Sequence, residues 1–317
     1  MMNWTRDEHE LRLAYSDSLI ECARTDGRIC VVEADLMGSS SATRFQKLYP
    51  ERTIDVGVAE ANMIGVAAGL AAMGKIPFTH TFTPFATRRC CDQVTLSVAY
   101  ARLNVKMVGS DPGICAELNG GTHMSFEDIA IMRNIPGMVV VEPVDTVQLK
   151  KLFPQIVAHD GPVYLRLFRK NAWKIFDADA EFTLGKACTL RRGRDATIFA
   201  TGMRVREALV AAEQLAGEGV DAEVVNIHTI KPLDAQAVLE SVSRTGCCVT
   251  AENAFVANGL GSAIADCVCA AHPCPVLKVG VEDRFGEVGK LDYLQETLHL
   301  TAEDIAEKVR RAVAMKV

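Results

Sequence analysis

The sequence predicts an α/β protein of two domains, each built on a mostly parallel sheet with helices on both faces. Strand and helix patterns alternate along most of the chain, and this alternation is typical of parallel sheets that are covered on both sides. The chain has 317 residues, enough for two domains with separate cores. A polar, irregular stretch at 172–192 connects the two α/β regions. We therefore expect a boundary near residue 185, with domains at 1–185 and 186–317.

The elements of the first domain follow from local patterns. Apolar residues recur at helical spacing over 8–25, and Asp26-Gly27 ends that helix. The further elements expected are a strand at 29–35, a Gly/Ser-rich loop at 38–41, a strand and helix at 53–74, a strand from residue 76, a helix at 92–102, a strand at 105–108, a Gly-rich loop up to 123, a helix at 126–133, and strands at 138–143 and 161–171. Ligands bind at the carboxyl ends of such strands, so Ser39 is either a ligand contact or an ordinary turn residue.

The second domain shows the same alternation. Its expected elements are strands at 195–202, 222–227, 247–252 and 276–281, and helices at 205–215, 235–242, from 259, and at 302–313. Gly259-x-Gly261 lacks the third glycine and the downstream acid of a dinucleotide-binding motif.

The most apolar stretch of the chain runs from Thr53 to Gly74, and Glu60 is the one charged residue of its helical part after Gly57. Burying a carboxylate costs several kcal/mol unless it is paired, hydrogen-bonded or protonated. A structural interpretation is equally supported by this stretch, since an acid at a helix start suits the helix dipole. Gly65 and Gly69 lie one turn apart among small residues, which allows close approach of another helix. We therefore expect a subunit interface next to Glu60.

Composition excludes several classes of function. The net charge of -6 and the lack of a nucleic-acid motif argue against nucleic-acid binding. The longest apolar run is too short for a membrane span, and the charged N-terminus has no signal core, so we expect a cytoplasmic protein. The eleven cysteines include no C-x-x-C pair, and we expect no metal ligands from this chain.

Two further features bear on a cofactor. Phe82 and Phe85 are either core residues or the walls of an apolar slot for a flat ring. The chain has no Gly-Asp-Gly followed roughly 25 to 30 residues later by Asn, the pattern expected for a metal-bound diphosphate. This chain can therefore hold only part of such a cofactor.

Several motifs in order resemble the pyrimidine-binding domain of transketolases over about residues 10–170. They are Ala34-Asp35-Leu36, Val58-Ala-Glu60-Ala-Asn-Met, Thr81-Phe82-x-x-Phe85, Asp92-Gln93, Gly121-Thr-His123 and Glu127-Asp-Ile-Ala-x-Met-Arg-x-Ile-Pro. The tail resembles the transketolase C-terminal domain at Glu252-Asn253, Gly259-Leu-Gly-Ser262 and Asp283-Arg-Phe-Gly286. Since the diphosphate-binding domain is missing, the chain resembles the small subunit of a split transketolase.

The resemblance implies thiamine diphosphate as cofactor. It implies that Glu60 hydrogen-bonds N1′ of the aminopyrimidine and drives activation of the cofactor, which requires a carboxyl group held out of water. Phe82 and Phe85 match the aromatic residues that pack on the pyrimidine ring. Asp35 matches a position near the cofactor and the subunit contact.

The resemblance also implies substrate contacts. His123 matches the histidine that contacts the donor's oxygens and transfers a proton. Arg169 and Ser39 match positions that hold the sugar phosphate, and Arg12 is a further candidate with a looser alignment. Substrates would be sugars or sugar phosphates.

The implied assembly is an A2B2 heterotetramer with an N-terminal, diphosphate-binding subunit. Thiamine diphosphate would lie in the interface, and its Mg²⁺ or Ca²⁺ would be ligated by that partner. The chain alone would be inactive. Two alternatives remain open: the β subunit of a 2-oxo acid dehydrogenase, and a non-catalytic transketolase-like partner.

Two departures from the family pattern bear on the substrate. Asn119 stands where the family has an aspartate that contacts the C2 hydroxyl of the donor. Asp111 stands where the family has a phosphate-binding histidine, and an acid there would repel a phosphate by roughly 1 kcal/mol or more. We therefore expect a donor or acceptor with a different end group or stereochemistry from those of the pentose phosphates.

Overall fold

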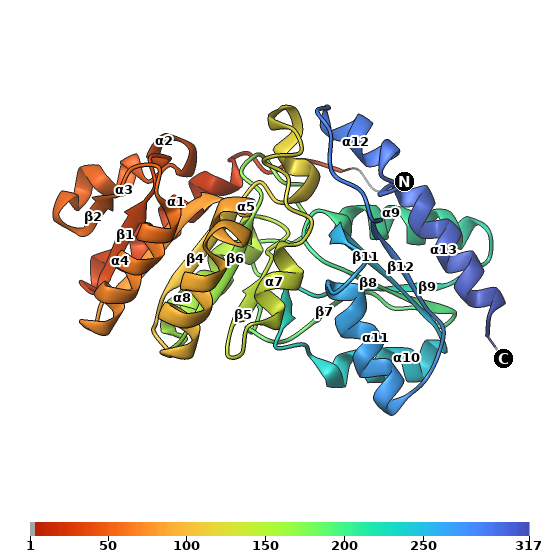
Figure 1. The fold of residues 1–317 in the computed structure, drawn as a ribbon. Helices are drawn as coiled ribbons and strands as arrows, with labels where there is room; N and C mark the ends of the chain where they lie inside the picture. Colours follow the sequence, from red (N-terminus) through yellow and green to blue (C-terminus); the bar gives the residue numbers. More distant parts are fainter. Residues whose placement is uncertain (1–3, 317) are drawn as a thin grey trace.

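The computed structural model describes residues 4–316, which form two α/β domains side by side (Figure 1). The sheet of the first domain has the strand order β10-β5-β6-β4-β3-β1-β2, and every neighbouring pair is parallel except β10 with β5. Its strands are β1 (Ile29–Glu33), β2 (Thr53–Asp55), β3 (Ile76–Phe82), β4 (Lys106–Ser110), β5 (Val139–Val141), β6 (Val163–Leu167) and β10 (Thr229–Lys231). The predicted parallel sheet is confirmed.

Helices cover both faces of this sheet. Its α-helices are α1 (Leu11–Thr25), α2 (Met37–Ser40), α3 (Thr43–Leu48), α4 (Glu60–Ala72), α5 (Thr83–Ala86), α6 (Cys91–Gln93), α7 (Asp128–Asn134) and α8 (Thr146–Ala158). Four short helical segments of other geometry are η1 (Pro50–Arg52), η2 (Arg88–Cys90), η3 (Val94–Tyr100) and η4 (Gly113–Asn119). Residues of α1, α3 and α8 form the core on one face, and residues of α4, η3 and α7 form the core on the other.

The second sheet has the order β12-β11-β8-β9-β7 and is parallel except at β7. Its strands are β7 (Cys188–Arg191), β8 (Ala196–Ala200), β9 (Ala222–Asn226), β11 (Cys248–Phe255) and β12 (Val276–Val281). Its helices are α9 (Arg204–Gly217), α10 (Ala235–Thr245), α11 (Leu260–Ala271), α12 (Leu291–Thr297) and α13 (Ala302–Ala314). One face packs on α9 and α13, and the other packs on α10 and α11.

The structure adds elements that the sequence patterns did not predict. Helices α8 and α12 were missed, and β7 lies inside the stretch expected to be a connection. Strand β10 follows β9 but pairs with β5, so the chain returns to the first sheet after entering the second. The boundary near residue 185 remains a proposal.

Two local predictions differ from the structure. The Gly/Ser-rich loop is the short helix α2, which ends at Ser41 in the left-handed region (φ 65°). Helix α4 lies in the most apolar stretch, which predicts burial, yet Asn62, Gly65, Gly69 and Ala72 are exposed in the single chain. The small residues that predict a subunit interface are therefore the ones that this chain leaves uncovered.

Candidate functional site

The predicted site residues gather at one edge of the first sheet. Strands β1, β3, β4 and β6 run parallel, so their carboxyl ends lie at the same edge. Asp35, Asp111 and Arg169 each follow one of these ends, and Phe82 is the last residue of β3. This edge is where open α/β sheets bind ligands.

Glu60 is the first residue of α4 and is only 4% exposed. Arg89 Nη1 donates to Glu60 Oε1 at 2.7 Å, and this bond compensates the carboxylate's charge. No side chain caps the start of α4, so Glu60 does not act as a helix cap. The Arg89 bond uses one oxygen of the carboxylate, and no hydrogen bond to the other oxygen is found among residues 4–316.

Phe82, Phe85 and His123 form an aromatic cluster next to Glu60. The ring centroids of Phe82 and Phe85 lie 6.1 Å apart, and His123 lies 5.6 Å from Phe82 and 5.2 Å from Phe85. All three pairs meet edge to face. The guanidinium of Arg89 stacks 3.7 Å from the Phe85 ring, which links the cluster to Glu60.

His123 is carried by the segment that leaves β4. Its Nδ1 lies 3.0 Å from Thr122 Oγ1. Gly121 just before it approaches the carbonyl of Gly286 so closely that a Cβ would lie 2.4 Å from that oxygen. Glycine is therefore required where this segment packs against the second domain. Asn119 is exposed at the end of η4, four residues before His123.

Arg169 and Asp111 form an ion pair beside Phe82. Arg169 Nε donates to Asp111 Oδ2 at 2.6 Å, and the Arg169 main-chain N–H donates to Oδ1 at 3.2 Å. The Arg169 guanidinium lies 4.8 Å from the Phe82 ring. Asp111 is buried, and its charge offsets that of the arginine expected to hold the end of the sugar.

Arg12 and Ser39 lie next to this pair. Arg12 Nη1 donates to the Ser39 carbonyl at 3.3 Å, and the Arg12 main-chain N–H donates to the Arg169 carbonyl at 3.2 Å. Asp35 is exposed, and its main-chain N–H donates to Asp55. The structure thus brings Arg12, Ser39 and Arg169 together. Asp35 follows β1, which lies two strands away from β4 in the sheet, so it is on the same edge but at a distance from this group.

Two features of the site were missed by sequence reasoning. Sequence reasoning gave Arg89 no role, although the arginine pair Arg88-Arg89 shortly after Phe85 was a signal for it. A buried polar group also lies beneath α2, where Ser40 Oγ donates to Glu33 Oε1 at 2.7 Å and His80 Nδ1 lies 3.7 Å from the same oxygen.

Within residues 4–316, no group of three or more His, Cys, Asp and Glu side chains is placed to hold a metal ion. No helix described by the structure is long and apolar enough to span a membrane.

Comparisons with known proteins agree over nearly the whole chain. Residues 7–173 match the transketolase pyrimidine-binding domain, and residues 185–305 match the transketolase C-terminal domain. The 6-deoxy-6-sulfo-D-fructose transketolase subunit SqwH of Clostridium sp. (strain MSTE9) is 64% identical over 310 residues, covering 98% of this chain and 96% of that protein. An apulose-4-phosphate transketolase subunit of Phocaeicola vulgatus is 36% identical over 273 residues, covering 86% of this chain and 87% of that protein. A solved split gene transketolase, an inactive beta4 tetramer, aligns with a TM-score of 0.90 at 39% identity, covering 98% of this chain and 100% of that one.

Proposed function

Because this chain belongs to the transketolase family, as the small subunit of a split transketolase, we propose that it transfers a two-carbon ketol unit between sugars with thiamine diphosphate as cofactor. The observation that carries this proposal is the chain of contacts that links Glu60, Arg89, Phe85 and His123. It joins a buried carboxylate, a pair of aromatic rings and an imidazole at the sheet edge where open α/β sheets bind ligands.

We propose that the pyrimidine end of the cofactor binds at this aromatic pair. A flat ring would pack on Phe82 and Phe85, and the Glu60 oxygen that is not bonded to Arg89 would share a proton with a ring nitrogen. When bound, thiamine diphosphate supplies the electron sink for carbon–carbon bond cleavage. Glu60 holds a proton at its carboxyl group, and His123 donates a hydrogen bond or proton to the sugar oxygens.

We propose that the diphosphate and its Mg²⁺ or Ca²⁺ are held by a partner subunit, in an A2B2 assembly. The uncovered side of α4 supports self-association, because Val58 and Met73 at its ends are also exposed. Leu96 and Tyr100 of the neighbouring η3 extend this apolar surface. Apolar patches of this kind mark protein interfaces.

The end group of the sugar is proposed to be singly charged. A phosphate monoester carries about -1.5 to -2 charges at neutral pH, whereas a sulfonate carries one. Asp111 already offsets the charge of Arg169, so the pair suits a monoanion better than a dianion. The 64% identity to a subunit named for 6-deoxy-6-sulfo-D-fructose supports such a donor.

The test is reconstitution with a diphosphate-binding subunit from the same genome, thiamine diphosphate and Mg²⁺. We expect no ketol transfer by either subunit alone. With both, kcat/KM for 6-deoxy-6-sulfofructose should exceed that for fructose 6-phosphate by about tenfold, as one unit of charge mismatch near a half-buried pair implies. Efficient use of xylulose 5-phosphate and ribose 5-phosphate would refute the end-group proposal. Decarboxylation of 2-oxo acids by the reconstituted enzyme would refute the proposal that it transfers ketol units.

A further inference from the structure

The turn that starts the His123 segment is held by a side chain of the second domain. Asn253 lies in β11 and is buried. Its Oδ1 accepts the main-chain N–H of Ile114 at 3.1 Å, and its Nδ2 donates to the carbonyl of Pro112 at 2.9 Å. One carboxamide therefore satisfies a donor and an acceptor on either side of Gly113.

Gly113 permits this close approach. Its φ is +53°, and a Cβ there would lie 2.3 Å from Asn253 Oδ1 and 2.5 Å from the Asn253 carbonyl oxygen. A side chain at this position would have to displace the amide or the turn. The contact between the turn and Asn253 therefore depends on glycine at residue 113.

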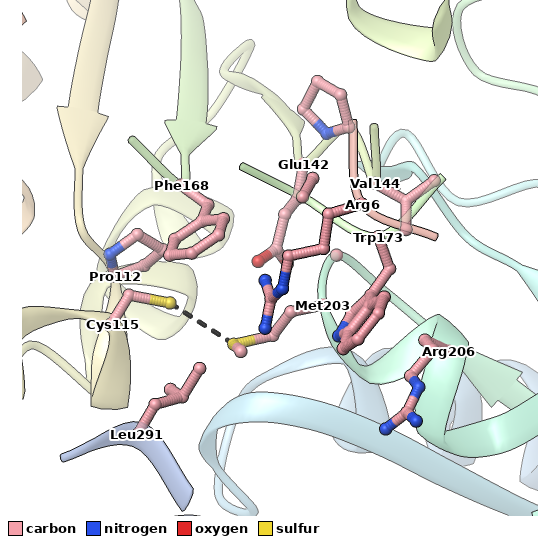
Figure 2. A pocket seen from close by; sticks show the side chains of 13 residues that line it. Arg6, Pro112, Cys115, Glu142, Val144, Phe168, Trp173, Met203, Arg206 and Leu291 are labelled. Atoms are coloured by element: carbon pink, nitrogen blue, oxygen red, sulfur yellow. Dashed lines mark hydrogen bonds between the residues drawn. The ribbon is translucent and has the colours of Figure 1, made fainter. Parts of the chain in front are cut away.

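Ile114 and Ala116 of this segment pack in the core of the second domain, while a small cavity of about 30 Å³ borders Pro112 and Cys115. Pro112 and Cys115 line one side of this cavity, with Phe168 and Met203 nearby (Figure 2). Cys115 Sγ points toward Met203 Sδ at 3.3 Å across its edge. A segment that borders empty space loses dispersion contacts on that side, so the directed hydrogen bonds from Asn253 contribute more to its position.

The ends of the turn carry the site. Asp111, the partner of Arg169, immediately precedes Pro112, and the segment runs on through η4 to His123. The main chain of Asn253 is itself fixed, because Arg166 Nη2 donates to its carbonyl at 2.6 Å. Displacement of the turn would therefore move both the sugar-end pair and the imidazole.

We propose that Asn253 is a positioning residue for ketol transfer, through which the second domain holds Asp111 and His123 in place. It touches neither substrate nor cofactor in this role. The catalytic part of this inference rests on the proposed function.

The test compares Asn253→Leu with Asn226→Leu in the full chain. Leucine is close in size to asparagine and its side chain makes no hydrogen bonds. Asn226 is a matched control because it is also a buried second-domain amide that bonds the first domain, with its Oδ1 accepting from Gln148 Nε2 at 2.8 Å. The first readout, amide hydrogen exchange over 111–123, needs no activity. The second is kcat and KM of the reconstituted enzyme below the melting temperature of both variants.

We expect Asn253→Leu to raise exchange over 111–123 by about tenfold or more, as the loss of its two buried hydrogen bonds to the turn implies, and Asn226→Leu to leave that segment unchanged. Misplacement of the site should lower kcat/KM by about 100-fold, through both kcat and KM, only in Asn253→Leu.

The proposal is wrong if the two variants show equal losses of melting temperature and of activity, and equal amide exchange over 111–123. If Asn253→Leu does not fold, Gly113→Ala is measured in the same way, and unchanged exchange and kinetics there overturn it. Wild-type enzyme without ketol transfer refutes the proposed function, while the exchange data still decide whether Asn253 holds the turn.

Discussion

Arg166 and Arg169 lie three residues apart and show two uses of the same guanidinium group. Arg166, in β6, is completely buried between the domains. Its Nε donates to Asp128 Oδ2 at 2.7 Å, its Nη1 to Glu142 Oε1 at 2.6 Å, and its Nη2 to the Asn253 carbonyl. Arg169, just beyond the strand, has one carboxylate partner and keeps part of its side chain in solvent.

The difference separates a structural charge from a functional one. Burial tends to lower the pKa of Arg166, but the carboxylates of Asp128 and Glu142 raise it well above its ordinary value. Its donors are used within the protein. Arg169, like Arg89 beside Glu60, retains donors at the sheet edge where we propose that ligands bind. We expect buried charges with all their bonds inside the protein to govern stability, and charges that keep bonding capacity at the proposed site to govern activity.

The largest effect expected on the functional side comes from Glu60→Gln. Glutamine keeps a hydrogen bond to Arg89 but cannot hold the proton, so ketol transfer should fall by about 10⁴-fold. The melting temperature should not drop, because the variant removes a buried charge. Steady-state kinetics of the reconstituted enzyme measure the loss, with Glu51→Gln as an exposed control that keeps wild-type rates. Full activity in Glu60→Gln would remove Glu60 from the mechanism.

On the structural side, Arg166→Met should be the most damaging substitution. It leaves the Asp128 and Glu142 carboxylates buried without their cation, which costs about 3–5 kcal/mol of unfolding free energy. Denaturant unfolding measures the loss. Arg44→Met, which removes a surface pair with Asp17, is the control and should change little. Equal losses in the two variants would contradict the distinction between buried and exposed charges.

Lys106 adds a third case to this comparison, a buried charged side chain whose hydrogen bonds go only to neutral groups. Its Nζ donates to the carbonyls of His159 and Gly161 at 2.6 and 2.9 Å. Burial lowers the pKa of Lys106 from 10.5 to about 7, an effect that Asp160 opposes. Between these pH values the unfolded chain retains the proton and the folded chain releases it, so the free energy of unfolding should rise with pH.

The expected gain from Lys106 between pH 7 and 9 is on the order of 2 kcal/mol. Melting curves across this range should show a rise in wild type relative to Lys106→Met. Lys151→Met, which removes an exposed pair with Glu181, serves as the control and should follow wild type. Parallel curves for wild type and Lys106→Met would show that Lys106 stays charged when folded.

The sequence predicted what local patterns determine. Alternating elements indicated both parallel sheets, and short motifs located Glu60, Phe82 and His123, because each depends on neighbouring residues. Strand β10 was missed because its pairing with β5 joins segments from different domains. Asp111 was interpreted from the sequence as a departure from the family pattern, but its partner was not foreseen, because 58 residues separate it from Arg169.

That ion pair supports the finest prediction, which concerns selectivity. Asp111→Asn keeps the size of the side chain and suits its positive φ of 52°, since asparagine tolerates the left-handed region. It returns the full charge of Arg169 to the site, so the ratio of kcat/KM for fructose 6-phosphate to that for 6-deoxy-6-sulfofructose should rise by about tenfold. Asp17→Asn, which breaks the surface pair with Arg44, should leave the ratio unchanged. A ratio that stays constant in Asp111→Asn would mean that the sugar's end group binds away from Arg169, and this partly exposed arginine would then belong with Arg166 as a structural residue.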